Sequence, residues 1–400
     1  KRETRLLRIL PVVILTVLLP DLYLYRTYLR KLRCRRLTLF LLALPDVVLL
    51  LSAVVLGCTE TLSPANMDVL GLFFLFYMIF ALPKAAFLLV SLPGRLLSPL
   101  LPGALSVATA VGVGAAVLLL GVMVYGSFRG PVRLRVTRSD FSSPDLPASF
   151  EGYRIVQLSD LHLISMRNHP GMVDRIVYAV AAERPDMVVF TGDLVSTDSK
   201  ELDGFEAALS RLHAPDGVYS VLGNHDYLKY ARYLTRRAQA EHFRELKDRQ
   251  RGMGWDLLLN EHRIIRRGSD SIALVGTENC GRPSFPCRGD LRKALAGLPA
   301  GEEAAGGSRL FKVLLSHDPT HWRDKVLPET DIQLTLSGHT HGMQFMLFGW
   351  SPSRYVYPEW RGLYTEGGRA LHVSLGLGGA LIPFRFGAWP EINVITLHRK

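Results

Sequence analysis

Five short motifs of aspartate, asparagine and histidine occur from residue 160 onward in this 400-residue chain. They are Asp160-Leu161-His162, Gly192-Asp193, Gly223-Asn224-His225-Asp226, Ser316-His317 and Gly338-His339-Thr340-His341. Carboxylate and amide oxygens, together with imidazole nitrogens, are suitable ligands for divalent Mn, Fe or Zn. One such motif would be weak evidence, but five in succession predict a hydrolytic site that contains two metal ions.

Each motif lies at the end of a short apolar segment that is typical of a β-strand. These segments cover residues 153–158, 187–191, 218–222, 312–315 and 332–336. We expect helices at 168–184, 202–212 and 231–251. We expect further strands at 263–265, 271–275, 371–375 and 392–397. Strands that alternate first with helices and then with tight hairpins predict a layered α/β domain with a central pair of sheets.

The hydrolysis of a phosphate ester needs a deprotonated nucleophile and positive charge near the phosphoryl oxygens, and two ions about 3.5–4 Å apart provide both. A carboxylate must then bridge the ions, and Asp193 is suited to this because it follows a strand and a glycine. Asp160 and His162 are two residues apart, so on an extended segment both side chains point the same way and can bind one ion. His339 and His341 have the same spacing, and a turn between them would let each bind a different ion.

Four other polar side chains complete the predicted site. Asn224 offers a neutral carbonyl oxygen and His317 offers an imidazole. His225 and Asp226 follow Asn224 directly, and we expect both to be catalytic. Asp226 would orient the His225 ring, which would then protonate the leaving oxygen. A single histidine such as His317 is more often structural than a ligand, so the joint occurrence of the motifs carries the prediction.

This ordered set resembles the motifs of the calcineurin-like metallophosphoesterases: Asp-x-His, Gly-Asp, Gly-Asn-His-Asp/Glu, a separate His and Gly-His-x-His. All five elements are present between Asp160 and His341. The resemblance implies a four-layer α-β-β-α sandwich over residues 151–400. It implies one ion held by Asp160, His162, Asp193 and His341. It implies a second ion held by Asp193, Asn224, His317 and His339, with His225 as acid or transition-state stabiliser.

Two further segments resemble the membrane-associated bacterial branch of this family. They are Gly342-Met343-Gln344 and the tail from Gly376 to Ile392, which contains Ile382-Pro383-Phe384-Arg385-Phe386. This branch includes UDP-diacylglucosamine pyrophosphohydrolases and other lipid-linked phosphoesterases. The resemblance implies a lipid or lipid-linked phosphate as substrate.

Four long apolar stretches precede the motifs, at about 6–25, 37–57, 69–92 and 104–126. Each is close to the ~20 residues that a helix needs to cross ~30 Å of hydrocarbon. Buried globular helices of this length without a polar face are rare, and the first stretch has no small-residue cleavage site of a signal peptide. We therefore expect a four-helix transmembrane domain over 1–128, with a linker and first strand at 129–150.

The net charge of +11 arises largely from basic residues near the ends of the expected spans. Such residues report topology and contact with anionic membrane lipids, and nucleic-acid binding is the less favoured interpretation because no groove-reading motif is present. The loop at 58–68 has no Lys or Arg, whereas the loop at 26–36 is densely basic. This asymmetry, although small, predicts an integral protein of the bacterial inner membrane whose α/β domain is extracytoplasmic.

Two ionisable residues within the expected spans, Asp46 and Lys84, each follow a Leu-Pro pair. Charged side chains at membrane depth are costly, so they are candidates for a function. The spacing of the spans places both at a similar depth, and we expect them to pair. The pair could be purely structural, or it could act in lipid access.

Two observations bear on the substrate and the compartment. Aromatic residues with interleaved arginines follow Gly-His-x-His, and we expect Trp350, Arg354 and Arg361 to contact a lipid headgroup, although a packed hairpin is an equal alternative. Cys280 and Cys287 lie close enough in sequence for a disulfide, but they could equally be two free thiols.

The sequence therefore favours a membrane-bound, two-metal phosphohydrolase that cleaves a phosphoester or pyrophosphate bond of a phospholipid or lipid-linked precursor. One alternative is a phosphodiesterase or nucleotide hydrolase that acts on soluble substrates and uses the helices only as an anchor. A second alternative is a non-enzymatic binding module, which the complete set of metal ligands argues against.

Overall fold

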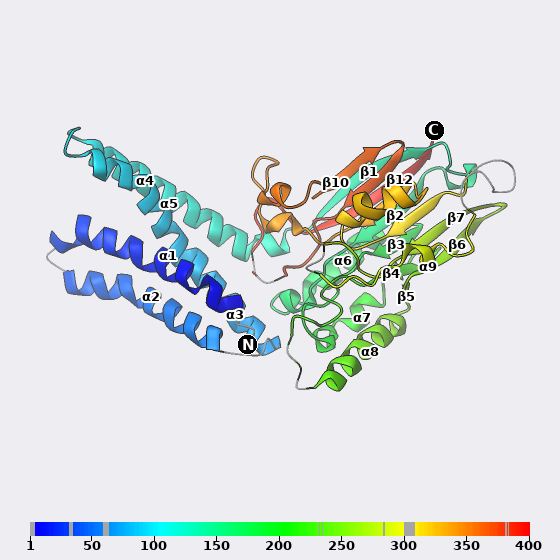
Figure 1. Ribbon diagram of the computed structural model, residues 1–400, viewed down its shortest axis with the longest axis horizontal. Coiled ribbons are helices and arrows are strands. Elements are labelled where there is room, and N and C mark those ends of the chain that lie inside the picture. The colour runs from blue at the N-terminus through cyan, green and yellow to red at the C-terminus, as the bar shows by residue number, and fades with distance from the viewer. Residues whose placement is uncertain are drawn as a thin grey trace. The chain divides into compact units, whose positions relative to one another are not determined.

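The computed structural model contains two compact units (Figure 1), a helical unit of residues 1–129 with 381–384 and an α/β unit of residues 130–380 with 385–400. The residues that it describes are 5–31, 35–58, 64–231, 233, 235–282, 285–299, 309–380, 382 and 384–400. Part of the loop at 58–68, on which the predicted topology rests, lies outside the described residues.

The described part of the helical unit consists of long apolar helices. They are α1 (Arg5–Thr27), α2 (Arg35–Cys58), α3 (Pro64–Phe76), α4 (Leu82–Leu97) and α5 (Ala104–Phe128). A π-helical turn at Tyr77–Ala81 joins α3 to α4, so the predicted span at 69–92 forms part of one continuous helical segment.

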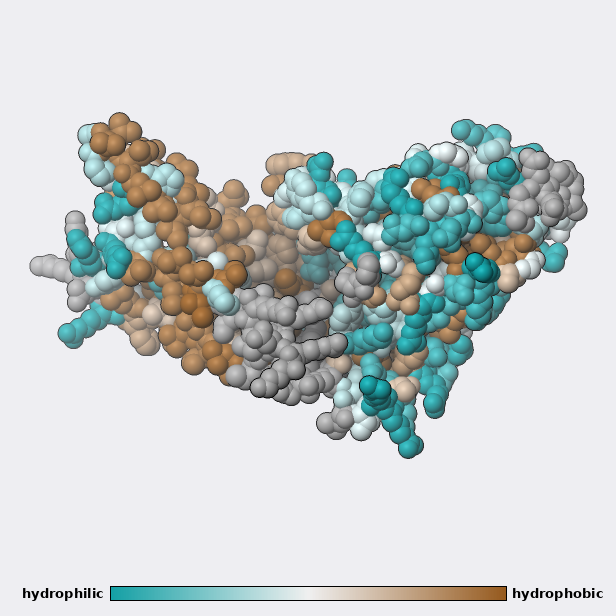
Figure 2. All heavy atoms as spheres, in the orientation of Figure 1, coloured by the Kyte–Doolittle hydropathy of each residue, from teal (hydrophilic) through white to brown (hydrophobic). Residues whose placement is uncertain are grey.

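Three of these segments are long and apolar enough to cross a membrane: Arg36–Leu56, Val69–Leu97 and Ala104–Phe128. Their apolar side chains face outward, as with Leu89 and Leu118, which are both 71% exposed. Figure 2 shows hydrophobic residues over much of the visible surface of the helical unit. A helix that is apolar all round needs a membrane or a protein core as its environment. The fourth expected span, at 6–25, coincides with α1 and stays a prediction.

The predicted pair of Asp46 and Lys84 is confirmed. The Lys84 Nζ donates a hydrogen bond to Asp46 Oδ2 and a second one, of 2.8 Å, to Asp21 Oδ1. Asp46 is only 3% exposed. Three helices, α1, α2 and α4, therefore share one largely buried ionic cluster, and Asp21 is a partner that the sequence did not predict.

The α/β unit contains two six-stranded mixed sheets. The first has the order β1-β12-β2-β3-β4-β5, in which β2 to β5 are parallel and β12 is antiparallel to β2. Its strands are β1 (Arg135–Ser143), β2 (Tyr153–Leu158), β3 (Met187–Phe190), β4 (Val218–Ser220), β5 (Asp256–Leu257) and β12 (Glu391–Arg399). The expected first strand within 129–150 is thus β1.

The second sheet has the order β10-β11-β9-β8-β7-β6, with the four central strands parallel and both edge strands antiparallel to their neighbours. Its strands are β6 (Glu261–Arg267), β7 (Asp270–Gly276), β8 (Lys312–Leu315), β9 (Leu334–Ser337), β10 (Gly362–Glu366) and β11 (Arg369–Val373). The antiparallel edges explain why the C-terminal part of the chain has tight hairpins.

Apolar side chains from both sheets meet in a central core that includes Ile155, Val189, Val313 and Leu334. The outer face of the first sheet is covered by α6 (Gly171–Ala182), α7 (Glu206–Leu209) and α8 (Arg236–Gly252). The outer face of the second sheet is covered by α9 (Leu291–Ala294), α10 (Leu327–Glu329) and the turn that contains Trp322. The four-layer α-β-β-α arrangement predicted from the sequence is therefore confirmed.

The helices predicted at 168–184 and 231–251 begin three and five residues later in the structure, as α6 and α8, and the helix predicted at 202–212 differs most. The segment at 202–212 contains only the short α7, because Gly204 adopts a φ of +84° and interrupts the helix before Phe205. This value lies in the left-handed region that glycine readily adopts.

Candidate metal centre

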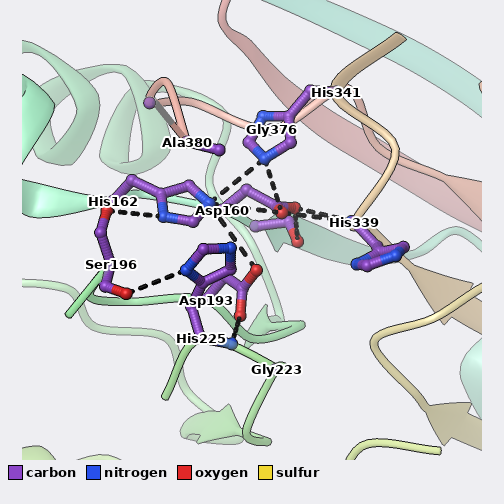
Figure 3. A network of polar contacts seen from close by, with 12 residues as sticks. Asp160, His162, Asp193, Ser196, Gly223, His225, His339, His341, Gly376 and Ala380 are labelled. Carbon is purple, nitrogen blue, oxygen red and sulfur yellow. Dashed lines mark hydrogen bonds and ion pairs between the residues drawn. The ribbon is translucent and has the colours of Figure 1, made fainter. Parts of the chain in front are cut away.

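The five motifs follow parallel strands of both sheets and converge at one edge of the sandwich. Asp160 and His162 come after β2, Asp193 comes after β3, and Asn224 with His225 comes after β4. His317 comes after β8, and His339 with His341 comes after β9. Figure 3 shows the side chains of Asp160, His162, Asp193, His225 and His341 pointing toward one another from separate loops. The carboxyl ends of parallel strands are the usual location of sites in α/β sheets.

The backbone of this cluster is unusual because five of the predicted ligands have a positive φ. The values are 51° for Asp160, 40° for His162, 60° for Asp193, 74° for His339 and 50° for His341. Non-glycine residues in this region are strained, and such strain gathers at functional sites. The expected extended conformation of Asp160 and His162 is therefore wrong. Their side chains converge through left-handed turns instead.

Asp160, His162 and His341 form the first group of potential ligands. The His341 Nε2 lies 3.2 Å from Asp160 Oδ1 and 3.2 Å from His162 Nε2. The His162 Nε2 lies 4.0 Å from Asp160 Oδ1. All three side chains are buried.

Asp193, His317 and His339 form the second group. The His317 Nε2 lies 3.1 Å from Asp193 Oδ2 and 3.2 Å from His339 Nδ1. The same Asp193 Oδ2 lies 3.7 Å from His162 Nε2, which belongs to the first group. Asp193 therefore contacts both groups, which is the position that a bridging carboxylate must occupy.

Asn224, which the family resemblance assigns to the second ion, carries a buried amide oxygen. Its Nδ2 donates a hydrogen bond of 2.9 Å to the Tyr230 hydroxyl, which fixes the orientation of the amide. The Oδ1 is buried and has no hydrogen-bond partner among the residues that the structure describes. A buried carbonyl oxygen without a partner is costly, and a cation would satisfy it.

The charge states of the cluster suit a pair of cations. Burial alone would raise the pKa of Asp160 and of Asp193, but the surrounding histidines lower both well below the usual aspartate value. Burial lowers the pKa of His162 strongly and that of His339 to about 4. The site thus holds ionised carboxylates and two neutral imidazoles, which are metal-ligating forms.

His317 behaves differently within the same cluster. Burial lowers its pKa, but the adjacent Asp193 carboxylate outweighs burial and raises the pKa to about 10. A proton on Nε2 thus neutralises the carboxylate from the position that a metal ion would take. The ligand atoms lie 3.1–4.0 Å apart, which fits ligands that surround ions at about 2.0–2.2 Å. The donor set therefore fits two divalent ions.

Each of the four candidate histidine ligands has a second partner that orients its ring. His162 Nδ1 lies 3.0 Å from Ser196 Oγ, and His317 Nδ1 lies 2.7 Å from the Thr191 carbonyl. His339 Nε2 lies 3.0 Å from the Tyr357 hydroxyl, and His341 Nδ1 lies 3.2 Å from Arg385 Nη2. Such partners of metal-ligating histidines commonly tune metal affinity. The spacing of the motifs gave no signal for Ser196, Thr191 or Tyr357.

Arg385 is a buried cation that holds the glycine-rich loop beside the first group. Its guanidinium donates hydrogen bonds of 2.6–3.1 Å to the carbonyls of Leu375, Gly378 and Ala388. A side chain on Gly376, whose φ is +72°, would come within 2.6 Å of the Asp160 Cβ. Gly376 and Arg385, which belong to the tail that resembles the membrane-associated branch of the family, therefore lie directly against Asp160 and His341 of the metal centre.

The two residues predicted to be catalytic lie in different surroundings, and the role of His225 toward the leaving group stays a prediction. The half-buried His225 lies next to His162, with ring centroids 4.8 Å apart, and its Nδ1 lies 2.9 Å from the Ser196 carbonyl. The expectation that Asp226 orients this ring is wrong. Both Asp226 oxygens accept backbone N–H groups, at 2.8–3.2 Å, from Asp193, Leu194, Val195 and Gly223. The buried Asp226 carboxylate therefore holds together the loop that follows β3 and the loop that follows β4.

The predicted headgroup contacts lie in the segment after His341. Trp350 packs against Tyr355 with ring centroids 6.3 Å apart, and Arg354 lies over the same Tyr355 ring. Arg361 lies over the Trp360 ring and contacts the Met346 sulfur. Their role toward substrate stays a prediction.

The sequence left two alternatives for Cys280 and Cys287, a disulfide or two free thiols. The structure shows that they form a disulfide.

A buried cluster of aspartates and histidines at the edge of an α-β-β-α sandwich defines a metal-dependent hydrolase. The model of the family "Calcineurin-like phosphoesterase" matches residues 153–343, and that of "Probable Calcineurin-like phosphoesterase, transmembrane domain" matches residues 6–131. The chain belongs to the calcineurin-like phosphoesterase family, as the motifs predicted, and is a phosphoester hydrolase that carries a transmembrane domain.

Several relatives share most of this length. The UDP-2,3-diacylglucosamine pyrophosphatase LpxG of Chlamydia muridarum is 36% identical over 71% of this chain and 98% of its own. An uncharacterized metallophosphoesterase of Bacillus subtilis is 29% identical over 68% of this chain and 88% of its own. A transmembrane protein with metallophosphoesterase domain from Danio rerio is 30% identical over 71% of this chain and 62% of its own.

Proposed function

We propose that the protein is a membrane-bound phosphohydrolase with two divalent metal ions, Mn, Fe or Zn, that cleaves a phosphoester or pyrophosphate bond in a phospholipid or lipid-linked precursor. The observation that carries this proposal is the position of Asp193 between two buried groups of ligands, in a chain that also has a transmembrane domain.

Seven side chains would hold the ions. Asp160, His162 and His341 would hold one ion, His317, His339 and Asn224 would hold the other, and Asp193 would be shared by both. When bound, the ions make water a stronger nucleophile near neutral pH and neutralise charge on the phosphoryl oxygens. The protein itself keeps bulk water out of the site, because six of these seven residues are buried and the seventh, His339, is half-buried.

His225 is the residue that would assist the leaving group. The Ser196 carbonyl accepts the Nδ1 proton, so the ring is held with Nε2 at its opposite end. In the imidazolium form, Nε2–H can give its proton to the oxygen that departs from phosphorus. Asp226 would support this step indirectly, since it holds the loops of Asp193 and His225 together.

A lipid-linked substrate is supported by three features. The chain carries its own transmembrane domain. Two Chlamydia relatives are named as pyrophosphatases of UDP-2,3-diacylglucosamine, an acylated sugar nucleotide. Trp350, Arg354 and Arg361 combine aromatic surface with positive charge, which suits a phosphorylated lipid headgroup. A substrate within the bilayer also meets a tethered enzyme at high effective concentration.

The extracytoplasmic location of the α/β unit in the bacterial inner membrane also belongs to this proposal. The disulfide between Cys280 and Cys287 favours an oxidising compartment, and it agrees with the distribution of basic loops. In intact cells, both thiols should react with a membrane-impermeant maleimide only after reduction. Labelling without a reductant would contradict the disulfide, and labelling only after cell lysis would place the unit in the cytoplasm.

The central experiment uses the purified full chain in nanodiscs, loaded with Mn and given a total lipid extract. Mass spectrometry should reveal one phosphorylated lipid class that disappears and a matching product that appears. Asp193→Asn in the same nanodiscs is the control and should consume nothing. Turnover of soluble phosphodiesters without any change in the lipids would favour the soluble-substrate alternative. A fully metal-loaded protein that hydrolyses neither would favour a binding module.

A further inference from the structure

Residues 345–350, directly after the last metal-site motif, form a small hairpin with an apolar tip. Leu347 and Trp350 pair through two backbone hydrogen bonds, of 2.8 and 2.9 Å. The two residues between them, Phe348 and Gly349, have φ values of +49° and +80°. Two-residue turns with positive φ at both positions favour Asn-Gly or Gly-Gly, because glycine and asparagine tolerate this conformation.

Phe348 is unfavourable here for two separate reasons. A phenylalanine with positive φ is strained, and its side chain is 100% exposed. An exposed large apolar side chain forgoes the stabilisation that burial would give. Strain and exposure at one position indicate that the side chain has a function outside the folded unit.

Other exposed apolar residues surround the tip. Met343 is 44% exposed, Leu347 43%, Trp350 39% and Tyr355 77%. Together with Phe348 these four residues form what we call the hairpin patch. Leu347 pairs with Trp350, and Trp350 packs against Tyr355. Exposed apolar side chains gathered in this way mark a site of interaction with a membrane or a partner.

Charge around the hairpin patch is positive. Arg354 and Arg361 are both exposed. The only acidic residue in 343–361 is Glu359, which is buried and forms an ion pair with Arg323. Amphipathic aromatics at the level of the headgroups, with arginines beside them, are the composition by which proteins contact anionic lipid.

Firm contacts connect the hairpin patch to the metal centre. The Ser351 hydroxyl donates to the Gly342 carbonyl at 2.7 Å, and the backbone of Met346 donates to the Phe386 carbonyl at 2.7 Å. In the same segment, the Tyr357 hydroxyl lies 3.0 Å from His339 Nε2. The patch is therefore a fixed extension of the loops that carry the ligands.

We propose that the hairpin patch docks onto the surface of an anionic lipid bilayer, with Phe348 inserted among the acyl chains and Arg354 and Arg361 against lipid phosphates. The transmembrane domain keeps the chain at a bilayer at all times, which favours lipid over a soluble partner as the occupant. This inference rests on the proposed function in one respect, that docking presents a lipid phosphate to the metal centre.

Depth-dependent fluorescence quenching tests the docking itself. In the full chain with Cys34→Ser and Cys58→Ser, Phe348→Cys is labelled with an environment-sensitive fluorophore in nanodiscs that contain about a third anionic lipid. Lipids with a doxyl quencher near the headgroup should quench this label strongly. The matched control is Ile264→Cys on β6, an apolar position that is 36% exposed on an edge strand of the second sheet, and its label should not be quenched. An unquenched label at position 348 would overturn the proposal.

Turnover tests what docking does. Phe348→Ser should lower the rate of lipid hydrolysis about tenfold, which corresponds to the loss of one apolar anchor, and leave the hydrolysis of a soluble p-nitrophenyl diester unchanged. Ile264→Ser should change neither rate. Equal loss on both substrates would overturn the docking role. If the wild type hydrolyses no lipid, the proposed function fails, but the quenching result still decides whether the patch docks.

Discussion

The protein has two largely buried polar clusters, and the negative charge of their carboxylates is balanced in different ways. Each gathers ionisable side chains from elements far apart in sequence, one in the metal centre and one around Lys84. In the helical unit the cluster contains its own cation, and the Lys84 ammonium binds both Asp21 and Asp46. In the metal centre, two carboxylates and several imidazole nitrogens face one another at 3.1–4.0 Å.

The cluster around Lys84 therefore has its counter-charge within the chain, whereas the metal centre needs metal ions from outside to balance its carboxylates. Among the described residues, the metal centre has two cations: the protonated His317, whose proton a metal ion would displace, and Arg385, most of whose hydrogen bonds go to backbone carbonyls. Both clusters retain a buried oxygen that has no hydrogen-bond partner within the described part of the chain, Asn224 Oδ1 in one and Asp46 Oδ1 in the other. Burying an ionised group is tolerable only when it is paired, so the two clusters should respond oppositely to chelators and to neutralising substitutions.

The largest effect should come from Asp193→Asn. This change keeps the volume of the side chain but removes the charge shared by both groups of ligands, so activity should fall about 10⁴-fold, on the order of 5 kcal/mol in transition-state stabilisation. Bound metal, measured by elemental analysis, should fall with it. Asp248→Asn, an exposed position on α8, is the control and should match the wild type. Full metal content in Asp193→Asn would refute the bridging role.

Lys84→Met should produce the next largest effect, and on stability rather than on chemistry. Removing the ammonium leaves the buried Asp46 and the half-buried Asp21 without a cation, which should cost about 3–5 kcal/mol. Asp46→Asn is the informative comparison, because Lys84 keeps Asp21 as a partner and the cluster loses its excess negative charge. Thermal unfolding in detergent should therefore show a large decrease for Lys84→Met and a small one for Asp46→Asn.

The same variants decide between the two interpretations of the membrane cluster. A structural pair predicts that folded Asp46→Asn hydrolyses lipid and soluble esters at wild-type rates. A selective loss of lipid hydrolysis in Asp46→Asn would instead favour a role in lipid access. Wild-type stability of Lys84→Met would show that the cluster does not depend on its internal cation, and the contrast with the metal centre would collapse.

Removal of the metal ions should have an intermediate effect that is confined to the α/β unit. Ions present at about 100 times their dissociation constant stabilise a fold by about 2.7 kcal/mol, so a chelator should lower the unfolding temperature of this unit. Added Mn or Zn should restore it. The cluster around Lys84 needs no such ion, so a chelator should leave the unfolding of the helical unit unchanged. An equal shift of both units would contradict the comparison.

The pH dependence of metal binding follows from His317. Its pKa of about 10 in the ion-free site means that the ring is protonated at neutral pH, and a metal ion must displace that proton. Metal affinity should therefore rise as pH increases from 6 to 9, up to about tenfold per unit, and fall as pH decreases. Calorimetry in buffers of different ionisation enthalpy should detect the released proton. Affinity that is independent of pH would contradict this state of His317.

The contrast between the clusters also explains what the sequence could predict. The ligand set was recognisable because each motif is contiguous and follows a strand, and the Asp46–Lys84 pair followed from the similar depth of two spans. Asp226 was misassigned because neighbours in sequence need not face each other, and its oxygens instead accept backbone N–H groups. The partners Ser196, Tyr357 and Arg385 depend on tertiary placement, which residue spacing does not encode.

The smallest effect, and the finest test of the comparison, should come from Arg385→Lys. Lysine keeps the buried positive charge but cannot donate to the carbonyls of Leu375, Gly378 and Ala388 at once. The loop beside Asp160 should loosen, and metal affinity should fall about 10–100-fold, as for other residues that position ligands. Raising the metal concentration should then restore most of the activity, which it cannot do for Asp193→Asn. Arg211→Lys, exposed beside Asp174, provides the matched control. If Arg385→Lys bound metal like the wild type, positive charge alone would suffice at this position, and the metal centre would resemble the Lys84 cluster more closely than its hydrogen bonds indicate.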